Sequence, residues 1–222
     1  MIQLVALDVA GTTVNDDGVV IQAFKKAFSQ IAPESWQLHA TEWTKYAFDT
    51  MGQSKIKVFT EILGDAYLAE AANDRFETAY LELIEAGGVS PIAGAESLIR
   101  SLRDRGIKVA LTTGFSRQTL DPLLAKLGWG ELLDITVVPS EAGEGRPSPA
   151  MIRFAAAAFG ITEPSQVVVV GDTESDMQAG VAFGALRCIG VLSGAHARDQ
   201  LVKAGASDVV NSVAEVQNLL FA

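Results

Sequence analysis

The sequence is poor in the residues and segments that mark secreted or membrane proteins. Cys188 is its one cysteine, so no intramolecular disulfide can form, and a lone thiol fits a reducing compartment. No apolar run reaches the length of a membrane span, and the N-terminus lacks a basic region followed by a cleavage-type segment. We therefore expect a cytoplasmic protein in which Cys188 packs as a small core residue in an apolar strand.

Positive charge is also scarce. The chain has 17 Lys and Arg residues against 27 Asp and Glu, which gives a formal net charge of −10. Such a field repels nucleic acid and anionic membranes, and a phosphate ligand would need local positive charge. We expect neither nucleic acid nor membrane as a partner. The 49% hydrophobic content over 222 residues is enough for one large domain or a domain with an insertion.

Apolar strand-like segments alternate with helical patterns along most of the chain. Strands are expected at residues 2–7, 108–112, 135–138, 167–170, 186–192 and 208–210. Helices are expected at residues 96–105, 117–127 and 149–159 and after the strands at 167–170 and 186–192. Four consecutive valines at 167–170 suit a central strand covered on both faces. This order predicts an α/β fold with a Rossmann-like, doubly wound parallel sheet.

A helix-rich segment interrupts this pattern after the first strand. Apolar residues recur with helical spacing at 21–31, 56–63 and 75–86, and no clear strand lies between them. We therefore expect a helical cap domain at residues 15–87, inserted into a core domain formed by residues 1–14 and 88–222. The aromatic residues expected to form a small core within the cap are Trp36, Trp43, Tyr46 and Phe48.

Polar residues follow the expected strands at their carboxyl ends or in the next loop. They are Asp8, Thr113, Arg146, Asp172, Thr173 and Asp176, and Gly114 directly follows Thr113. In doubly wound sheets ligands bind beyond the carboxyl ends of the strands, so these side chains should converge. Their convergence from four separate segments is stronger evidence for a site than any one motif.

These residue types suit phosphoryl transfer. Asp8 and Asp172, brought close together, would repel each other unless a cation lay between them, and oxygen ligands favour Mg²⁺. Asp8 could then act as the nucleophile and form an aspartyl-phosphate, with Thr113 and Arg146 contacting the phosphoryl oxygens. Asp176 would hold metal-bound water or orient Arg146. Taken singly, Asp172 could also be a helix cap and Arg146 a solvated loop charge.

The same segments resemble the four motifs of the haloacid dehalogenase superfamily. The motifs fall at residues 8–13 (DVAGTT), at Thr113, at Arg146 and at residues 171–176 (GDTESD). The resemblance implies an inserted helical cap, an aspartyl-phosphate intermediate and bound Mg²⁺. It assigns Asp8, Ala10 and Asp172 to the metal, with Thr173 and Asp176 supporting them.

Two departures from the usual motifs point to one branch of the superfamily. Ala10 stands where most phosphatases carry an Asp that protonates the leaving alkoxide, and Arg146 stands where Lys is usual. Both resemble the phosphonoacetaldehyde hydrolases (phosphonatases). Residues 51–56 are similar to the phosphonatase segment that carries a Schiff-base lysine, which maps onto Lys55, with Gly52 as a substrate contact. Further similar segments are residues 112–117, 145–149 and 171–176.

The resemblance predicts a hydrolase that cleaves a P–C bond through a Lys55 Schiff base and releases an aldehyde and phosphate. The alternatives are a phosphatase acting on a small phosphate monoester, where Lys55 only binds phosphate, and a non-catalytic phosphate-binding protein. Val58, Phe115 and Gly18 replace a histidine, an aromatic hydroxyl and a cysteine of the phosphonatases, which leaves the exact substrate open.

Some residues remain outside these motifs. Lys57 is a poorer candidate than Lys55 for the reactive amine, because residues i and i+2 do not share a helix face. His39 and His196 are the only histidines, and both are expected at the surface or as helix caps. The resemblance also implies a homodimer formed through the cap near residues 21–31, whereas the residues alone leave the oligomeric state open.

Overall fold

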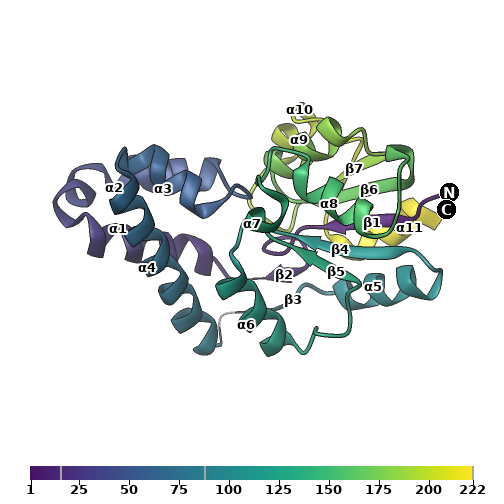
Figure 1. Cartoon of the computed structure of the whole chain (residues 1–222), viewed down its shortest axis with the longest axis horizontal. Coiled ribbons are helices and arrows are strands. Elements are labelled where there is room, and N and C mark those ends of the chain that lie inside the picture. Colours follow the sequence, from purple (N-terminus) through teal and green to yellow (C-terminus); the bar gives the residue numbers. More distant parts are fainter. Residues whose placement is uncertain (16, 88, 222) are drawn as a thin grey trace.

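A computed structural model describes residues 1–15, 17–87 and 89–221 (Figure 1). Its main sheet has six strands in the order β5-β4-β1-β6-β7-β8, and every neighbouring pair is parallel. The strands are β1 (Leu4–Leu7), β4 (Lys108–Thr112), β5 (Ile135–Val137), β6 (Val167–Gly171), β7 (Arg187–Val191) and β8 (Asp208–Val210). The predicted parallel α/β sheet is confirmed, with each expected strand in place.

Helices cover both faces of this sheet. One face packs against α5 (Ala95–Asp104), α6 (Arg117–Leu127) and α11 (Val216–Phe221). The other packs against α8 (Ala150–Ala158), α9 (Glu174–Phe183) and α10 (Arg198–Lys203). Side chains alternate between the faces, so Val5 and Leu7 join the first layer while Leu4 and Ala6 join the second. The valines of β6 are buried on both faces, as their run predicted.

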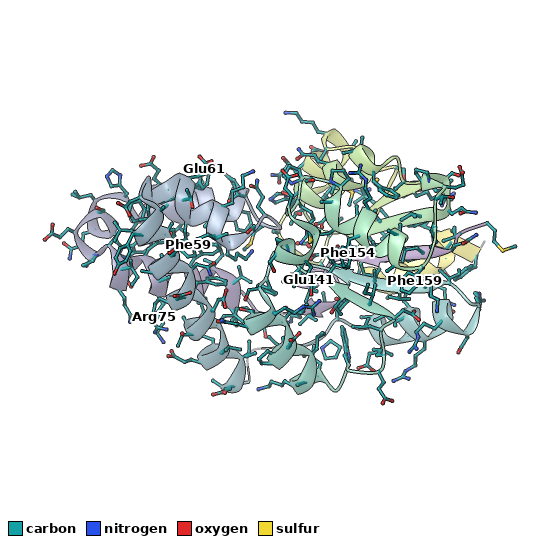
Figure 2. All side chains as sticks on the ribbon, in the orientation of Figure 1. Phe59, Glu61, Arg75, Glu141, Phe154 and Phe159 are labelled. Atoms are coloured by element: carbon teal, nitrogen blue, oxygen red, sulfur yellow. The ribbon has the colours of Figure 1, made fainter. Side chains whose placement is uncertain are left out.

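Four helices are inserted between β1 and β4, and they are called the cap below. They are α1 (Val19–Ile31), α2 (Pro33–Asp49), α3 (Lys55–Leu63) and α4 (Ala66–Glu85), and they extend from one end of the sheet in Figure 1. The cap interior is aromatic: Phe24, Phe28, Phe59 and Phe76 are fully buried, with ring centroids 4.8 to 6.1 Å apart. Phe59 lies among the cap helices in Figure 2.

The predicted aromatic core of the cap is only partly correct. Trp36 and Trp43 pack on the ring of Phe28, as expected. Tyr46 and Phe48 are instead 39% and 42% exposed. Helix α2 buries only a narrow stripe against α1, so residues three and five positions after Trp43 fall outside that contact.

Two short strands join the cap to the rest of the chain. Strand β2 (Val14–Asn15) pairs antiparallel with β3 (Ser90–Pro91). Both strands are too short to show the alternation of apolar and polar residues by which a strand is predicted from sequence. The division into residues 1–14, 15–87 and 88–222 stays a prediction, and residue 88 itself lies outside the described residues. Within those residues, no helix combines the length and apolar character that a membrane crossing requires.

Helix α9 lies unusually close to the sheet. A Cβ at Gly180 would stand 2.5 Å from the Cys188 Sγ and 3.1 Å from the Cβ of Val169. Cys188 is buried, and burial raises the pKa of its thiol to about 11. Its predicted place as a small core residue in an apolar strand is confirmed. The contact fixes how α9 and the loop before it approach the sheet.

We expect Gly180→Ala to destabilise the protein although alanine is the better helix former. Overpacking costs about 1–3 kcal/mol, while the gain in helix propensity is at most about 1 kcal/mol. Urea denaturation of wild type, G180A, C188A and the double variant forms the test. Removing the sulfur should recover part of the loss, so the two substitutions should be non-additive. A G180A protein at least as stable as wild type would contradict this packing.

Candidate active site

Asp8 is the first residue after β1, at the edge of the sheet that faces the cap. Its main-chain N–H donates to the Val170 carbonyl at 2.9 Å, which extends the ladder between β1 and β6 by one residue. The Thr13 hydroxyl donates to the Asp8 carbonyl at 2.9 Å and closes the turn that follows. These bonds fix the main chain at Asp8, and its side chain is buried.

Asp172 follows β6, lies beside Asp8 and is also buried. Its Oδ1 accepts from the Thr12 hydroxyl at 3.0 Å and its Oδ2 from the Ala195 N–H at 2.8 Å. Glycine is required at position 11, where φ is +86° and a Cβ would stand 2.5 Å from Oδ2. Burial, and secondly the charge of Asp8, raise the pKa of Asp172 to about 7.

Thr173 and Asp176 form the N-terminal cap of α9. The Thr173 Oγ1 accepts from the Asp176 N–H at 3.3 Å, and the Asp176 Oδ2 accepts from the Thr173 N–H at 3.1 Å. This reciprocal pair is a capping box. The capping role considered for Asp172 therefore belongs to Thr173, and Asp172 is left directed at the site.

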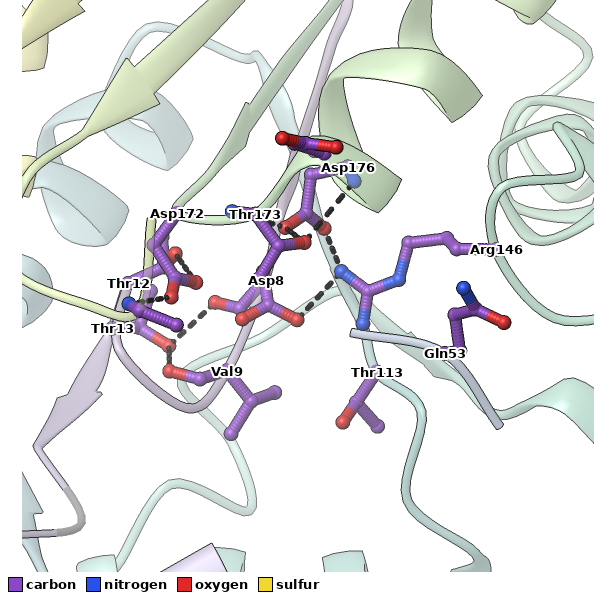
Figure 3. Close-up of polar contacts among 12 residues, drawn as sticks. Asp8, Val9, Thr12, Thr13, Gln53, Thr113, Arg146, Asp172, Thr173 and Asp176 are labelled. Atoms are coloured by element: carbon purple, nitrogen blue, oxygen red, sulfur yellow. Dashed lines mark hydrogen bonds and ion pairs between the residues drawn. The ribbon is translucent and has the colours of Figure 1, made fainter. Parts of the chain in front are cut away.

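Arg146 reaches the same place from the loop after β5. Its Nη1 lies 2.7 Å from the Asp8 Oδ1 and also makes an ion pair with Asp176 (Figure 3). The side chain is buried, so it is not a solvated loop charge. The contact with Asp176 agrees with the expectation that this carboxylate orients Arg146. Among the described residues, the buried Arg146 Nε has no hydrogen-bond partner.

The acidic residues suit a divalent cation. Oxygen atoms of Asp8, Asp172 and Asp176 lie within 4.8 Å of one another, and Arg146 is their one contacting cation among the described residues. Three carboxylates around one guanidinium leave negative charge, and hard oxygen donors are those that Mg²⁺ prefers. Asp176 is already engaged by Thr173 and Arg146, which makes Asp8 and Asp172 the better ligands. Ala10 lines the cavity but could offer only its backbone carbonyl.

The cap closes over these residues through a loop at 51–54. A Cβ at Gly52 would stand 2.5 Å from the Thr173 Oγ1, and a Cβ at Gly114 would overlap the Gln53 carbonyl. Thr113 is buried beside this contact, and its Oγ1 accepts from the Phe115 N–H at 3.2 Å. The structure thus brings the predicted residues Gly52, Thr113 and Gly114 to one interface.

Lys55 is the first residue of α3 and enters the same cavity from the cap. The cavity has a volume of about 240 Å³, and Asp8, Thr113, Arg146 and Asp172 line it together with Lys55. The lysine is only 7% exposed, and its Nζ lies 5.7 and 5.4 Å from the ring centroids of Phe24 and Phe115. Lys57 is exposed, in line with its lower rank as a candidate.

His196 lies next to the site, and its burial was not foreseen from the sequence. It was expected at the surface or as a cap; it does cap α9, since its Nδ1 accepts from the Glu174 N–H at 2.9 Å, but it is buried. Its main-chain N–H donates to the Asp172 carbonyl at 3.2 Å. The loop after β7 lies at the same sheet edge, so the rule that located Asp8 would have found it.

Comparison with known proteins identifies the family. Residues 2–184 match the haloacid dehalogenase-like hydrolases. The chain belongs to this family. A phosphonoacetaldehyde hydrolase of Bacteroides fragilis is 28% identical over 100% of this chain and 89% of its own length. A bifunctional phosphonoacetaldehyde hydrolase/aminoethylphosphonate transaminase of Clostridioides difficile is 30% identical over 82% of this chain and 30% of that longer protein.

Solved structures support the fold of this haloacid dehalogenase-like hydrolase. A hydrolase from Pseudomonas syringae superimposes with a TM-score of 0.86 over 99% of this chain and 98% of that one, at 21% identity. A phosphonoacetaldehyde hydrolase-like protein from Oleispira antarctica gives a TM-score of 0.80 over 99% and 91%, also at 21% identity. At this identity the likeness concerns the architecture.

The raised pKa of Asp172 predicts how pH and Mg²⁺ act on stability. Its pKa is about 7 in the fold against an ordinary value of 3.8, so the folded state binds the extra proton between these limits. Stability should therefore fall as pH rises from about 4 to about 7 without divalent ions, by on the order of a few kcal/mol. Mg²⁺ binds the ionised form, so it should raise the melting temperature more above pH 7 than near pH 5.

Thermal melts with EDTA and with Mg²⁺ at both pH values measure this effect. Asp172→Asn should flatten the pH dependence and abolish the Mg²⁺ shift, whereas Asp74→Asn, at an exposed position on α4, should leave both unchanged. An equal Mg²⁺ shift in wild type and D172N would show that Asp172 does not hold the ion.

Proposed function

We propose that this hydrolase cleaves the P–C bond of a phosphono-aldehyde such as phosphonoacetaldehyde and releases an aldehyde and phosphate. The observation that carries the proposal is one cavity that holds both Asp8 and the buried amine of Lys55. Asp8 enters this cavity from the core and Lys55 enters it from the cap. A carboxylate and an amine in these positions can react with the two ends of a small substrate. Similarity to proteins named phosphonoacetaldehyde hydrolase supports the same reading.

The carbon end of the substrate would react with Lys55. The uncharged amine attacks the aldehyde carbon, the carbonyl oxygen takes up a proton, and the resulting hydroxyl leaves as water. A protonated imine remains, with a C=N bond to Lys55. Its positive nitrogen can accept the electron pair that is released when the neighbouring P–C bond breaks.

The phosphorus end would react with Asp8. A carboxylate oxygen of Asp8 attacks phosphorus, and the P–C electron pair moves into the protonated imine to give an enamine. Thr113 and Arg146 line the same cavity as Asp8 and would donate to the phosphoryl oxygens in this step. The enamine carbon then takes up a proton, water releases the aldehyde from Lys55, and a second water splits the acyl phosphate to free Asp8 and phosphate.

Ala10 fits this chemistry better than ester hydrolysis. An alkoxide leaving group needs a proton donor, and an alanine side chain has none. An electron pair that is drawn into an imine does not need that donor. Asp8, Asp172 and the Ala10 carbonyl are the groups proposed to hold Mg²⁺, which when bound would neutralise charge between the carboxylate and the phosphoryl group.

Borohydride reduction tests the amine. With phosphonoacetaldehyde, reduction should trap an adduct on the peptide that contains Lys55, detected by mass spectrometry, and the untreated enzyme should release acetaldehyde and phosphate. Lys57→Ala is the matched control and should react like wild type. If no adduct forms and no acetaldehyde is released, the proposal is wrong. Efficient hydrolysis of p-nitrophenyl phosphate would instead favour the monoester phosphatase.

Replacing the nucleophile tests the phosphorus end. Asp8→Asn should lower kcat by at least about 1,000-fold, because an amide oxygen is a poor nucleophile, while the circular dichroism spectrum stays unchanged. The borohydride adduct at Lys55 should still form, since it precedes attack on phosphorus. Turnover near the wild-type rate would remove Asp8 from this role.

A further inference from the structure

Glu77 is a buried carboxylate that the phosphoryl site does not use. It lies on the inner face of α4 and is only 7% exposed. The other buried residues of this helix are Ala69, Ala72, Phe76, Ala79, Tyr80 and Ile84. A carboxylate in such surroundings is costly to desolvate, and its burial at a cleft suggests a function.

The position of Glu77 relates it to Lys55. Both residues line a second cavity of about 380 Å³ between cap and core, and Lys55 also lines the cavity of Asp8. The Asn73 Nδ2 donates to the Glu77 Oε1 at 3.0 Å and fixes the carboxylate. The other charged groups that line this second cavity are Lys57 and Glu144.

Aromatic contacts bring the two groups to the same region. The ring of Phe115 lies 4.9 Å from the ring of Tyr80, which is one helical turn after Glu77, and 5.4 Å from the Lys55 Nζ. The rings of Phe24 and Phe115, which lie next to the Lys55 Nζ, attract the ammonium form of lysine. A group that removes its proton is therefore needed before the amine can attack.

The Asp8 cavity offers no such group from the cap. Among the described cap residues that line it, Lys55 is the only one with a titratable side chain. Val58, which stands in place of the phosphonatase histidine, is apolar and buried. The core carboxylates of that cavity, Asp8 and Asp172, are the proposed nucleophile and metal ligand. The second cavity that Lys55 lines holds Glu77 and Glu144, of which Glu77 is buried and Glu144 exposed, so Glu77 is the candidate for the proton transfer.

We infer that Glu77 is the proton-transfer group that serves Lys55. The inference rests on the proposed function. The Glu77 carboxylate accepts a proton from the Lys55 ammonium, across a cavity large enough for bridging water, and leaves the amine free to attack the aldehyde. The resulting carboxylic acid then returns this proton to the hydroxyl that leaves as water when the C=N bond forms. The carboxylate is regenerated and no other reactant is needed.

The test compares Glu77→Gln with wild type in the full-length protein. We expect the rate of borohydride-trapped adduct formation at Lys55, and kcat, to fall by about 10- to 100-fold. Glu77→Asp should recover part of the rate. Glu70→Gln, at an exposed position on the same helix, is the matched control and should behave as wild type.

Two measurements separate proton transfer from a structural role. The melting temperature and the affinity for inorganic phosphate should stay within error of wild type in E77Q, because phosphate binds at Asp8 rather than in the second cavity. If E77Q does not fold, Asn73→Ala keeps the carboxylate but frees its orientation, and it should slow trapping. An unchanged trapping rate in the folded variant overturns the inference. A wild type that forms no adduct overturns the proposed function instead.

Discussion

Repulsion among Asp8, Asp172 and Asp176 is the constraint on which the site depends. At 4.8 Å, the limit of their separation, each pair of charges repels by about 3 kcal/mol at the effective dielectric typical of proteins. The positive charge of Arg146 offsets part of this repulsion. The Thr12 hydroxyl and the Ala195 N–H, which donate to Asp172, offset a further part. What remains is negative charge in a buried place, which a cation can satisfy. The groups that offset the repulsion come from loops after separate strands. These loops must therefore lie close enough together for the ion pair and the hydrogen bonds to form.

That meeting was predictable because it follows from topology. Asp8, Thr113 and Asp172 each follow a strand in the sequence, and parallel strands end at one edge of the sheet. The period of apolar residues located those strands to within one or two positions. Arg146 was harder to place, because the short helix α7 (Pro139–Ala142) separates it from β5. Its position in the segment that follows β5 was still enough to assign it to the same edge of the sheet.

The docking of the cap was not predictable from the same patterns. Helical periodicity shows that a helix has an apolar face, but not which neighbour that face meets. For this reason Tyr46 and Phe48 were placed in the wrong environment, and the burial of Glu77 went unnoticed. The strands β2 and β3 also depend on contacts between residues 75 or more positions apart, which no local window contains. Lys55 was found only because its segment resembles a known family.

Two glycines set the distance between the halves of the molecule. At Gly52 and Gly114 the chain carries no side chain where cap and core meet, and a single added carbon would overlap Thr173 or the Gln53 backbone. The absence of a Cβ at these two positions therefore lets cap and core approach each other closely. A methyl group at either position would act as a wedge, holding amine and carboxylate apart while leaving both intact. The shape of the cavity between cap and core therefore depends on glycine at both positions.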